Sequence, residues 1–215
     1  MATMLAFVVC DAEVEKARWQ AMLAAAVDAS FNAVTVDGDT STNDCVLAMA
    51  NGASKVKAHS DEELAALAAA LNEVCQALAY MVVEDAEGGT KIIRVEVIGA
   101  EDNMQAEACA RAVGHSPLVK TAMFGRDANW GRIVAAVGRS GAEFDPDNVT
   151  VSIGGIPVFV GGQPVAGDLD SLLAPHMRRK EIAISVNLGA GPGEYLLLAS
   201  DLTHEYVSIN ADYRS

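Results

Sequence analysis

The sequence predicts a mixed α/β protein, and three features carry this prediction. Apolar residues recur at helical spacing along residues 60–81, and shorter apolar runs typical of strands flank this segment. Gly and Pro become frequent after about residue 142, among several short strand-like runs. Hydrophobic residues make up 51% of the 215 residues, enough for a substantial core. We therefore expect layered sheets flanked by helices, with an α/β lobe over 1–141 and a smaller strand-rich lobe over 142–215.

The first half of the chain is expected to alternate strands and helices. Residues 3–10 form a short apolar run that predicts a buried strand, and Asp11 is a favourable N-cap for a helix directly after it. The capping box Ser60-x-x-Glu63 precedes the apolar stripe of a long helix. Further along, a strand is expected at 91–98 and a helix at 103–114.

Pro117 and a glycine-rich run shape the expectations for the second half. Because a proline restricts the residue before it, residues 116–123 are expected to be extended. A short helix is expected at 130–139, followed by strands at 149–153, 156–160, 181–188 and 194–200. The run 189–193 lies between the last two strands, with no helix after it. We interpret it as a hairpin connection, because a phosphate-binding loop needs a helix N-terminus.

Charge and composition argue against several classes of partner. The formal net charge of −14 disfavours binding to nucleic acid, which draws on Lys and Arg. No apolar run reaches the roughly 20 residues of a membrane span. The cysteines are far apart and form no CxxC pair, so we expect reduced thiols and no metal site: Cys10, Cys45, Cys75 and Cys109. We therefore expect a cytoplasmic protein.

Thr3 has two interpretations. It is either an ordinary strand residue or an amino-terminal nucleophile, whose hydroxyl attacks a carbonyl while its own α-amine acts as base. The pKa of an α-amine lies near 8, which suits that role. The amine must be free, so the peptide bond between Ala2 and Thr3 must be cut.

A polar cluster over residues 37–44 also has two interpretations. Its Asp37-x-Asp39-x-Ser41 spacing is similar to the start of a calcium loop. The sixth and twelfth positions hold Thr42 and Ala48 instead of Gly and Glu, so we reject an EF-hand. The cluster is either a hydrogen-bonded turn or one wall of an active site.

Four stretches, taken together and in order along the chain, form a specific pattern, although none of them would be specific by itself. They are MATMLAF (1–7), FNAVTVDGDTSTND (31–44), SPLVKTAMFGRDANWGRI (116–133) and YVSINADYRS (206–215). Together they resemble signature segments of the ornithine acetyltransferases, also called glutamate N-acetyltransferases. The resemblance implies an Ntn-type, DmpA/ornithine acetyltransferase-like fold. It also implies an acyltransferase of arginine biosynthesis that moves acetyl from N-acetylornithine to glutamate through an acetyl-threonine intermediate.

The resemblance also implies a processed protein. Precursors of this family cleave themselves at an Ala-Thr bond, here Ala2–Thr3, and the two pieces stay together as α and β subunits, commonly α2β2. This chain would then be the C-terminal β subunit. The family's oxyanion donors and a further substrate-binding Thr and Lys lie in α. No cofactor is expected, although some members accept acetyl-CoA as a second acetyl donor.

Site residues carry over position by position. Thr3 matches the nucleophile. The stretch Asp85–Lys91 matches the family's Asp-Gly-Glu-Gly-x-Thr-Lys except that Ala86 replaces a Gly, so Glu87 matches the substrate-contacting Glu. Asn210 and Ser215 match two substrate-contacting residues near the family's C-terminus. Seen alone, Glu87 is an ordinary loop carboxylate and the other two are tail residues.

Two other functions stay open. The chain could belong to a related Ntn-type amidase or aminopeptidase, which lets water take the acyl group. It could also be a non-catalytic subunit whose signature segments serve only packing.

Overall fold

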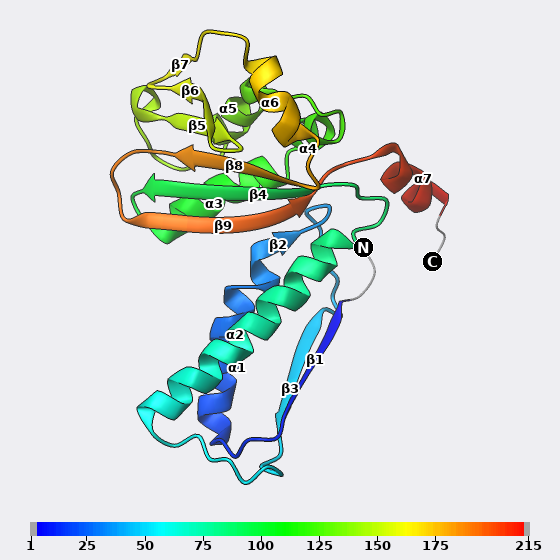
Figure 1. Ribbon diagram of the computed structural model, residues 1–215, viewed down its shortest axis with the longest axis vertical. Helices are drawn as coiled ribbons and strands as arrows, with labels where there is room; N and C mark the ends of the chain where they lie inside the picture. The colour runs from blue at the N-terminus through cyan, green and yellow to red at the C-terminus, as the bar shows by residue number, and fades with distance from the viewer. Residues whose placement is uncertain (1–3, 213–215) are drawn as a thin grey trace. The chain divides into compact units, whose positions relative to one another are not determined.

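The computed structural model describes residues 4–212, and its backbone forms two compact units. Unit 1 takes the chain up to Val34 and from Asp39 to Val82, and unit 2 takes Thr35–Gly38 and the chain from Val83 on. Each unit packs helices on a sheet (Figure 1), which confirms the expected mixed α/β class.

This grouping differs from the division expected at residues 141/142. Strand β4 (Ile92–Ala100) pairs in parallel with β8 (Glu181–Asn187) and antiparallel with β9 (Gly193–Ser200). Because β4 lies between two strands from the last third of the chain, the backbone hydrogen bonds of one sheet cross the expected boundary.

Unit 1 is built on a parallel pair of strands, β1 (Leu5–Cys10) and β3 (Cys45–Ala50). Helices α1 (Lys16–Asp28) and α2 (Asp61–Glu84) lie on one side of this pair (Figure 1). The short helix η1 (Phe31–Ala33) follows α1. The apolar side chains that face one another form the core of the unit: Val8, Trp19, Ala26, Leu71 and Cys75.

The other face of the β1–β3 pair is exposed in this chain. Large apolar side chains alternate along the strands with exposed fractions between 51% and 70%: Leu5, Phe7, Val9, Leu47 and Met49. The expected strand is confirmed over Leu5–Cys10, but the expectation that it is buried is wrong for this face. We call these five side chains the outer face of β1–β3.

Helix α1 begins later than Asp11 suggests. The N-cap position belongs to Glu15, and the backbone of residues 11–13 bonds to the backbone of residues 52–58 instead of entering a helix. Ser54 N–H donates to Asp11 O at 3.0 Å, and Glu13 N–H donates to Val56 O at 2.8 Å. The expected N-cap at Asp11 is therefore wrong, because tertiary bonds hold that backbone extended.

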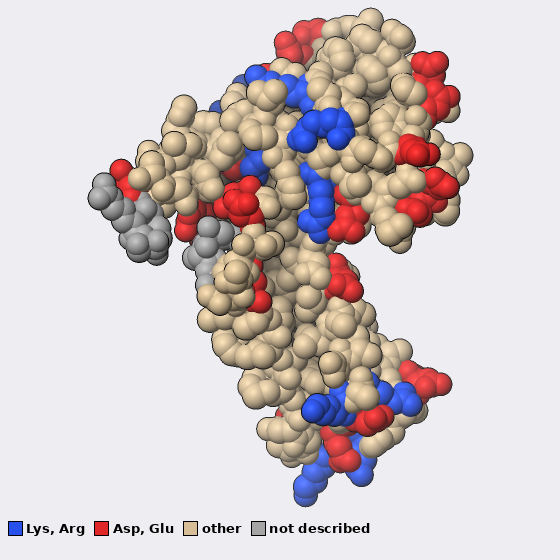
Figure 2. All heavy atoms as spheres, turned by 180° about the vertical axis from the view of Figure 1, so that it is seen from behind, with Lys and Arg blue, Asp and Glu red and all other residues tan. Residues whose placement is uncertain are grey.

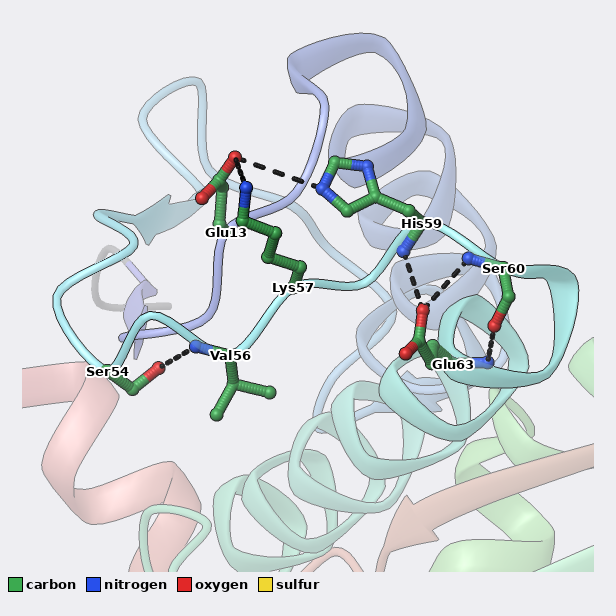
Figure 3. Close-up of polar contacts among 7 residues, drawn as sticks. All are labelled: Glu13, Ser54, Val56, Lys57, His59, Ser60 and Glu63. Carbon is green, nitrogen blue, oxygen red and sulfur yellow. Dashed lines mark hydrogen bonds and ion pairs between the residues drawn. The ribbon is translucent and has the colours of Figure 1, made fainter.

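The capping box before α2 is confirmed (Figure 3). Ser60 Oγ accepts from Glu63 N–H at 3.2 Å, and Glu63 Oε2 accepts from Ser60 N–H at 2.9 Å and His59 N–H at 3.1 Å. These bonds favour the carboxylate, so the pKa of Glu63 is lowered. Figure 3 also shows the Glu13 carboxylate beside Lys57 and His59, which lie in the segment that leads to the cap.

Among residues 4–212, one helix, α2, has the length and apolar composition of a membrane span. A single such helix is weak support for a membrane, because helices in protein cores share these properties. Leu71 and Cys75 of α2 pack in the core of unit 1.

Unit 2 contains a seven-stranded sheet in the order β2-β9-β4-β8-β5-β6-β7. Its remaining strands are β2 (Val34–Thr35), β5 (Thr150–Ile153), β6 (Ile156–Val160) and β7 (Gln163–Pro164). Helix α3 (Asn103–Gly114) packs on β4 and β9, and α5 (Trp130–Gly138) packs on α3. The other helices are α4 (Pro117–Phe124), η2 (Pro146–Asn148), α6 (Leu169–Met177) and α7 (His204–Asp212). The expected helices and strands of this region are thus confirmed, apart from two segments.

The first of these is residues 116–123, which are helical and not extended. Pro117 occupies the first position of α4, where its missing N–H costs nothing. Ser116 is extended, as a residue before proline should be, and its Oγ accepts from Val119 N–H at 3.4 Å as the N-cap. The proline therefore marks the start of a helix and not a strand.

The second is the run 189–193, which does not make a hairpin. Strands β8 and β9 are separated by β4, so their connection crosses the end of β4. Gly191 is needed there because an added Cβ would lie 1.9 Å from Ala100 O. The glycines of the run 189–193 thus allow it to lie close against the backbone of another segment.

Charged side chains are unevenly distributed. Figure 2 shows acidic and basic side chains on unit 2, whereas most charged side chains of unit 1 gather at the end where α1 and α2 begin. All four cysteines are free, and burial raises the pKa of Cys109 to about 12.

Candidate functional site

The backbone next to the predicted nucleophile is held by the polar cluster 37–44. Met4 N–H donates to Asp44 Oδ1 at 2.9 Å, and Met4 O accepts from Cys45 N–H at 3.0 Å. The second oxygen of Asp44 accepts from Ser41 N–H at 3.0 Å. The cluster thus includes a hydrogen-bonded turn that anchors β1 at its first residues. Ala2, Thr3 and Ser215 lie outside the described residues.

Two other predicted site residues lie together in unit 2. Asn210 Nδ2 donates to Glu87 Oε2 at 3.2 Å, across 123 residues of sequence. The same nitrogen donates to Tyr206 O at 3.0 Å, within α7. Both side chains are exposed, so a carboxylate and a carboxamide are presented together to solvent. Such a pair can accept hydrogen bonds from an ammonium group and donate one to a carbonyl or carboxylate.

Asp201 anchors the loop that carries Glu87. Its carboxylate is 2% exposed and accepts from Thr90 N–H at 2.8 Å, Thr90 Oγ1–H at 2.6 Å and Lys91 N–H at 3.0 Å. Hydrogen bonds to a buried carboxylate are among the stronger ones in proteins. Residues 90–91 are therefore fixed relative to the segment between β9 and α7.

The Lys91 side chain fixes the same loop to a second element. Its ammonium donates to the carbonyl oxygens of Met177, Arg178 and Arg179 at 3.3, 3.2 and 2.6 Å, at the C-terminal end of α6. A cation suits this end of a helix, where carbonyl groups lack partners. Burial, with the charge of Arg126, lowers the pKa of Lys91.

Thr203 joins the loop to the helix that carries Asn210. Its hydroxyl donates to Gly88 O at 2.6 Å and accepts from Tyr206 N–H at 3.1 Å. The second bond makes Thr203 the N-cap of α7.

A buried lysine completes the polar network of unit 2. Lys120 is 3% exposed, and its ammonium donates to Val36 O at 2.6 Å and to Ser200 O. Burial lowers the pKa of Lys120 to about 8, although Asp201 and Asp37 act in the opposite direction. Asp37 in turn accepts from the Tyr206 hydroxyl at 3.1 Å. The segment 36–37, β9 and α7 are thereby linked.

Metal ligands are not clustered in the part of the chain that the structure describes. Among residues 4–212, no group of three or more His, Cys, Asp or Glu side chains is arranged to hold a metal ion.

Sequence reasoning missed the residues that hold this site together: Asp201, Thr203, Lys91 and Lys120. Asp201 and Thr203 did carry a signal, because Asp and Thr shortly before a helix are typical of N-terminal caps. Nothing local in the sequence shows which distant backbone groups the two lysines bind.

Comparison with known proteins gives consistent matches along the chain. The model of the family described as "ArgJ family" matches residues 1–215. The arginine biosynthesis bifunctional protein ArgJ of Nitratidesulfovibrio vulgaris is 58% identical over 215 residues, which are 100% of this chain and 54% of that protein. ArgJ of a Synechococcus species is 46% identical over 223 residues, with 99% of this chain and 54% of that protein covered. This chain thus spans about half the length of these relatives.

A solved structure shows the same fold. The crystal structure of the arginine biosynthesis bifunctional protein argJ from Bacillus halodurans superposes with a TM-score of 0.93 and 40% sequence identity. The match covers 98% of this chain and 100% of that chain.

Proposed function

Because the chain belongs to the ArgJ family, we propose that it is the β subunit of an ornithine acetyltransferase. In this proposal the enzyme moves an acetyl group from N-acetylornithine to glutamate in arginine biosynthesis, in the cytoplasm. The family match along the whole chain carries the proposal. The hydrogen bond between Asn210 and Glu87 adds support, because resemblance selected these residues independently of their contact.

The chemistry is a two-step acyl transfer. Thr3 Oγ attacks the acetyl carbonyl of N-acetylornithine, the Thr3 α-amine accepts the hydroxyl proton, and ornithine leaves with a proton on its nitrogen. The amine of glutamate then attacks the acetyl-Thr3 ester, which releases N-acetylglutamate and restores the hydroxyl. Glu87, Asn210 and Ser215 bind the substrates in this scheme. Water must be excluded, because it would hydrolyse the ester.

This mechanism requires a free amine on Thr3, so cleavage at Ala2–Thr3 is part of the proposal. Chain lengths support it: the matched Bacillus halodurans chain is covered completely, whereas the two curated relatives are covered over 54% of their length. A separate polypeptide of about this length is what cleavage would produce. The relatives' name "bifunctional" fits the use of acetyl-CoA as a second acetyl donor.

The partner in this proposal is the remaining segment of the precursor, the α subunit, with α2β2 as the assembly. The outer face of β1–β3 supports a partner of this kind. Parallel strands normally have both faces covered, and a two-stranded sheet is marginal alone. Five large apolar side chains on that face are exposed here. We assign this face to the remaining segment, which also supplies the oxyanion donors in our scheme.

Intact mass spectrometry of the purified enzyme tests the reaction. We expect a chain that begins at Thr3, gains one acetyl group on addition of N-acetylornithine and loses it when glutamate is added. Loss of the acetyl group to water at the same rate without glutamate would indicate an amidase instead. A chain that never gains acetyl, with activity unchanged in Thr3→Ala, would indicate a non-catalytic subunit.

Co-purification of the two segments tests the interface. Phe7→Asp places a charge on the outer face of β1–β3, where Phe7 is 59% exposed in this chain. Leu172→Asp is the matched control, because Leu172 is 58% exposed on α6. We expect Phe7→Asp to weaken association with the remaining segment and Leu172→Asp to leave it unchanged. Equal association of both variants would refute the assignment of this face.

A further inference from the structure

The hydroxyl of Thr203 lies between the two segments that carry the predicted substrate-contacting residues. It is a donor to the carbonyl of Gly88, next to Glu87, and an acceptor from the amide of Tyr206, one turn before Asn210. We propose that Thr203 is a positioning residue that fixes the separation of Glu87 and Asn210. This inference rests on the proposed function of those two residues.

A hydroxyl suits this place because it can donate and accept at once. Thr203 is 5% exposed, so solvent has little access to replace it. Valine has nearly the same shape but can do neither, whereas serine keeps both bonds. The two substitutions therefore separate the hydroxyl from the volume of the side chain.

The backbone of the loop presses against the start of α7 at the same point. Gly88 has a φ of +63°, and an added Cβ would lie 2.6 Å from Tyr206 N. Alanine at this position must push the loop away from α7 and also strains its own backbone. Gly88→Ala thus changes the same separation without altering Thr203.

Loss of the Thr203 hydroxyl should leave α7 in place. Tyr206 is held independently by its own hydroxyl, which donates to Asp37 Oδ2 at 3.1 Å. The loop is likewise held by Asp201 and Lys91. We therefore expect altered spacing at Glu87 and Asn210, and not an unfolded enzyme.

Steady-state kinetics of the assembled enzyme test the proposal, with N-acetylornithine and glutamate as substrates. We expect Thr203→Val and Gly88→Ala to raise KM for one or both substrates roughly tenfold, the factor of one lost hydrogen bond, with kcat changed much less. Thr203→Ser should restore KM. Ser116→Ala removes the cap of α4 and none of the bonds of this loop, so it should leave KM unchanged.

The double variant shows whether Thr203 acts through Glu87. In a Glu87→Gln background, Thr203→Val should raise KM much less than in the parent, because coupled residues are not additive. Additive effects, an unchanged KM in Thr203→Val, or an equal rise in Ser116→Ala would overturn the inference. If Glu87→Gln alone leaves KM unchanged, the proposed role of Glu87 fails, and the inference fails with it. If Glu87→Gln raises KM and Thr203→Val does not, only the inference is overturned.

Discussion

Removing the Asp201 carboxylate should destabilise unit 2 more than removing any single helix cap. Asp201→Ala leaves three donors without their partner: Thr90 N–H, Thr90 Oγ1–H and Lys91 N–H. Thr90 is exposed, so water can replace the bond to its hydroxyl. The loss in free energy of unfolding then comes from the two backbone bonds, from Thr90 N–H and Lys91 N–H to the buried carboxylate, at about 1.5–3 kcal/mol each. With partial relaxation of the loop, we expect a loss of about 3–5 kcal/mol.

Two further variants give smaller expected losses of stability, against which that of Asp201→Ala can be compared. Asp201→Asn keeps an oxygen for both backbone donors and can donate to the Thr90 hydroxyl, so we expect a loss of about 1–2 kcal/mol. Asp102→Ala removes a single capping bond, from Gln105 N–H at 2.9 Å in α3, and should cost about 1 kcal/mol.

The assay combines thermal unfolding of the assembled enzyme with hydrogen exchange measured by mass spectrometry. Peptides that span residues 88–92 should exchange at least tenfold faster in Asp201→Ala than in Asp102→Ala. If the two variants are equally stable and protect this segment equally, the loop does not depend on Asp201 as we describe.

Three further predictions concern other features. Burial lowers the pKa of Lys120 from 10.5 to about 8, so the unfolded chain binds this proton more tightly. Stability should therefore rise between pH 8 and 10.5, and a Lys120→Met variant with an equal slope in its melting temperature would contradict this. Ser60→Ala should destabilise unit 1 by about 1 kcal/mol in a denaturant titration. Ser54→Ala, outside the cap, should cost less, because water can replace the two bonds of its exposed hydroxyl to Asp11 O and Val56 N–H. Because the pKa of Cys109 is about 12, it should resist iodoacetamide at pH 8 until urea is added, and rapid native labelling would show that it is accessible.

Local patterns predicted the elements whose identity depends on local physics. The apolar stripe of α2, its capping box and the alternation in β4 are all properties of neighbouring residues. Where the prediction failed, distant contacts decided the outcome. Residues 11–13 bond to residues 52–58, and β4 separates β8 from β9. The rule that a residue before proline is extended held for Ser116. The expectation that the chain stays extended after Pro117 was wrong, because α4 begins there.

The candidate site could be predicted only through resemblance. A carboxylate in a glycine-rich turn and an amide near the end of the chain carry no local sign of function. Their contact depends on Asp201 and Thr203, which bond to the 88–91 segment from more than a hundred residues away. Such long-range pairing has no periodic signature in a single sequence.

The outer face of β1–β3 has a consequence for how the protein must be made. An exposed apolar sheet with open edges attracts other copies of itself, especially when its concentration is high. If its covering segment is synthesised on the same polypeptide, the effective concentration of that segment is about millimolar, well above that of competing chains. Cleavage after folding would then cut the peptide bond between two segments that are already associated. Expression of this chain by itself should yield inclusion bodies, and joint expression should yield soluble enzyme.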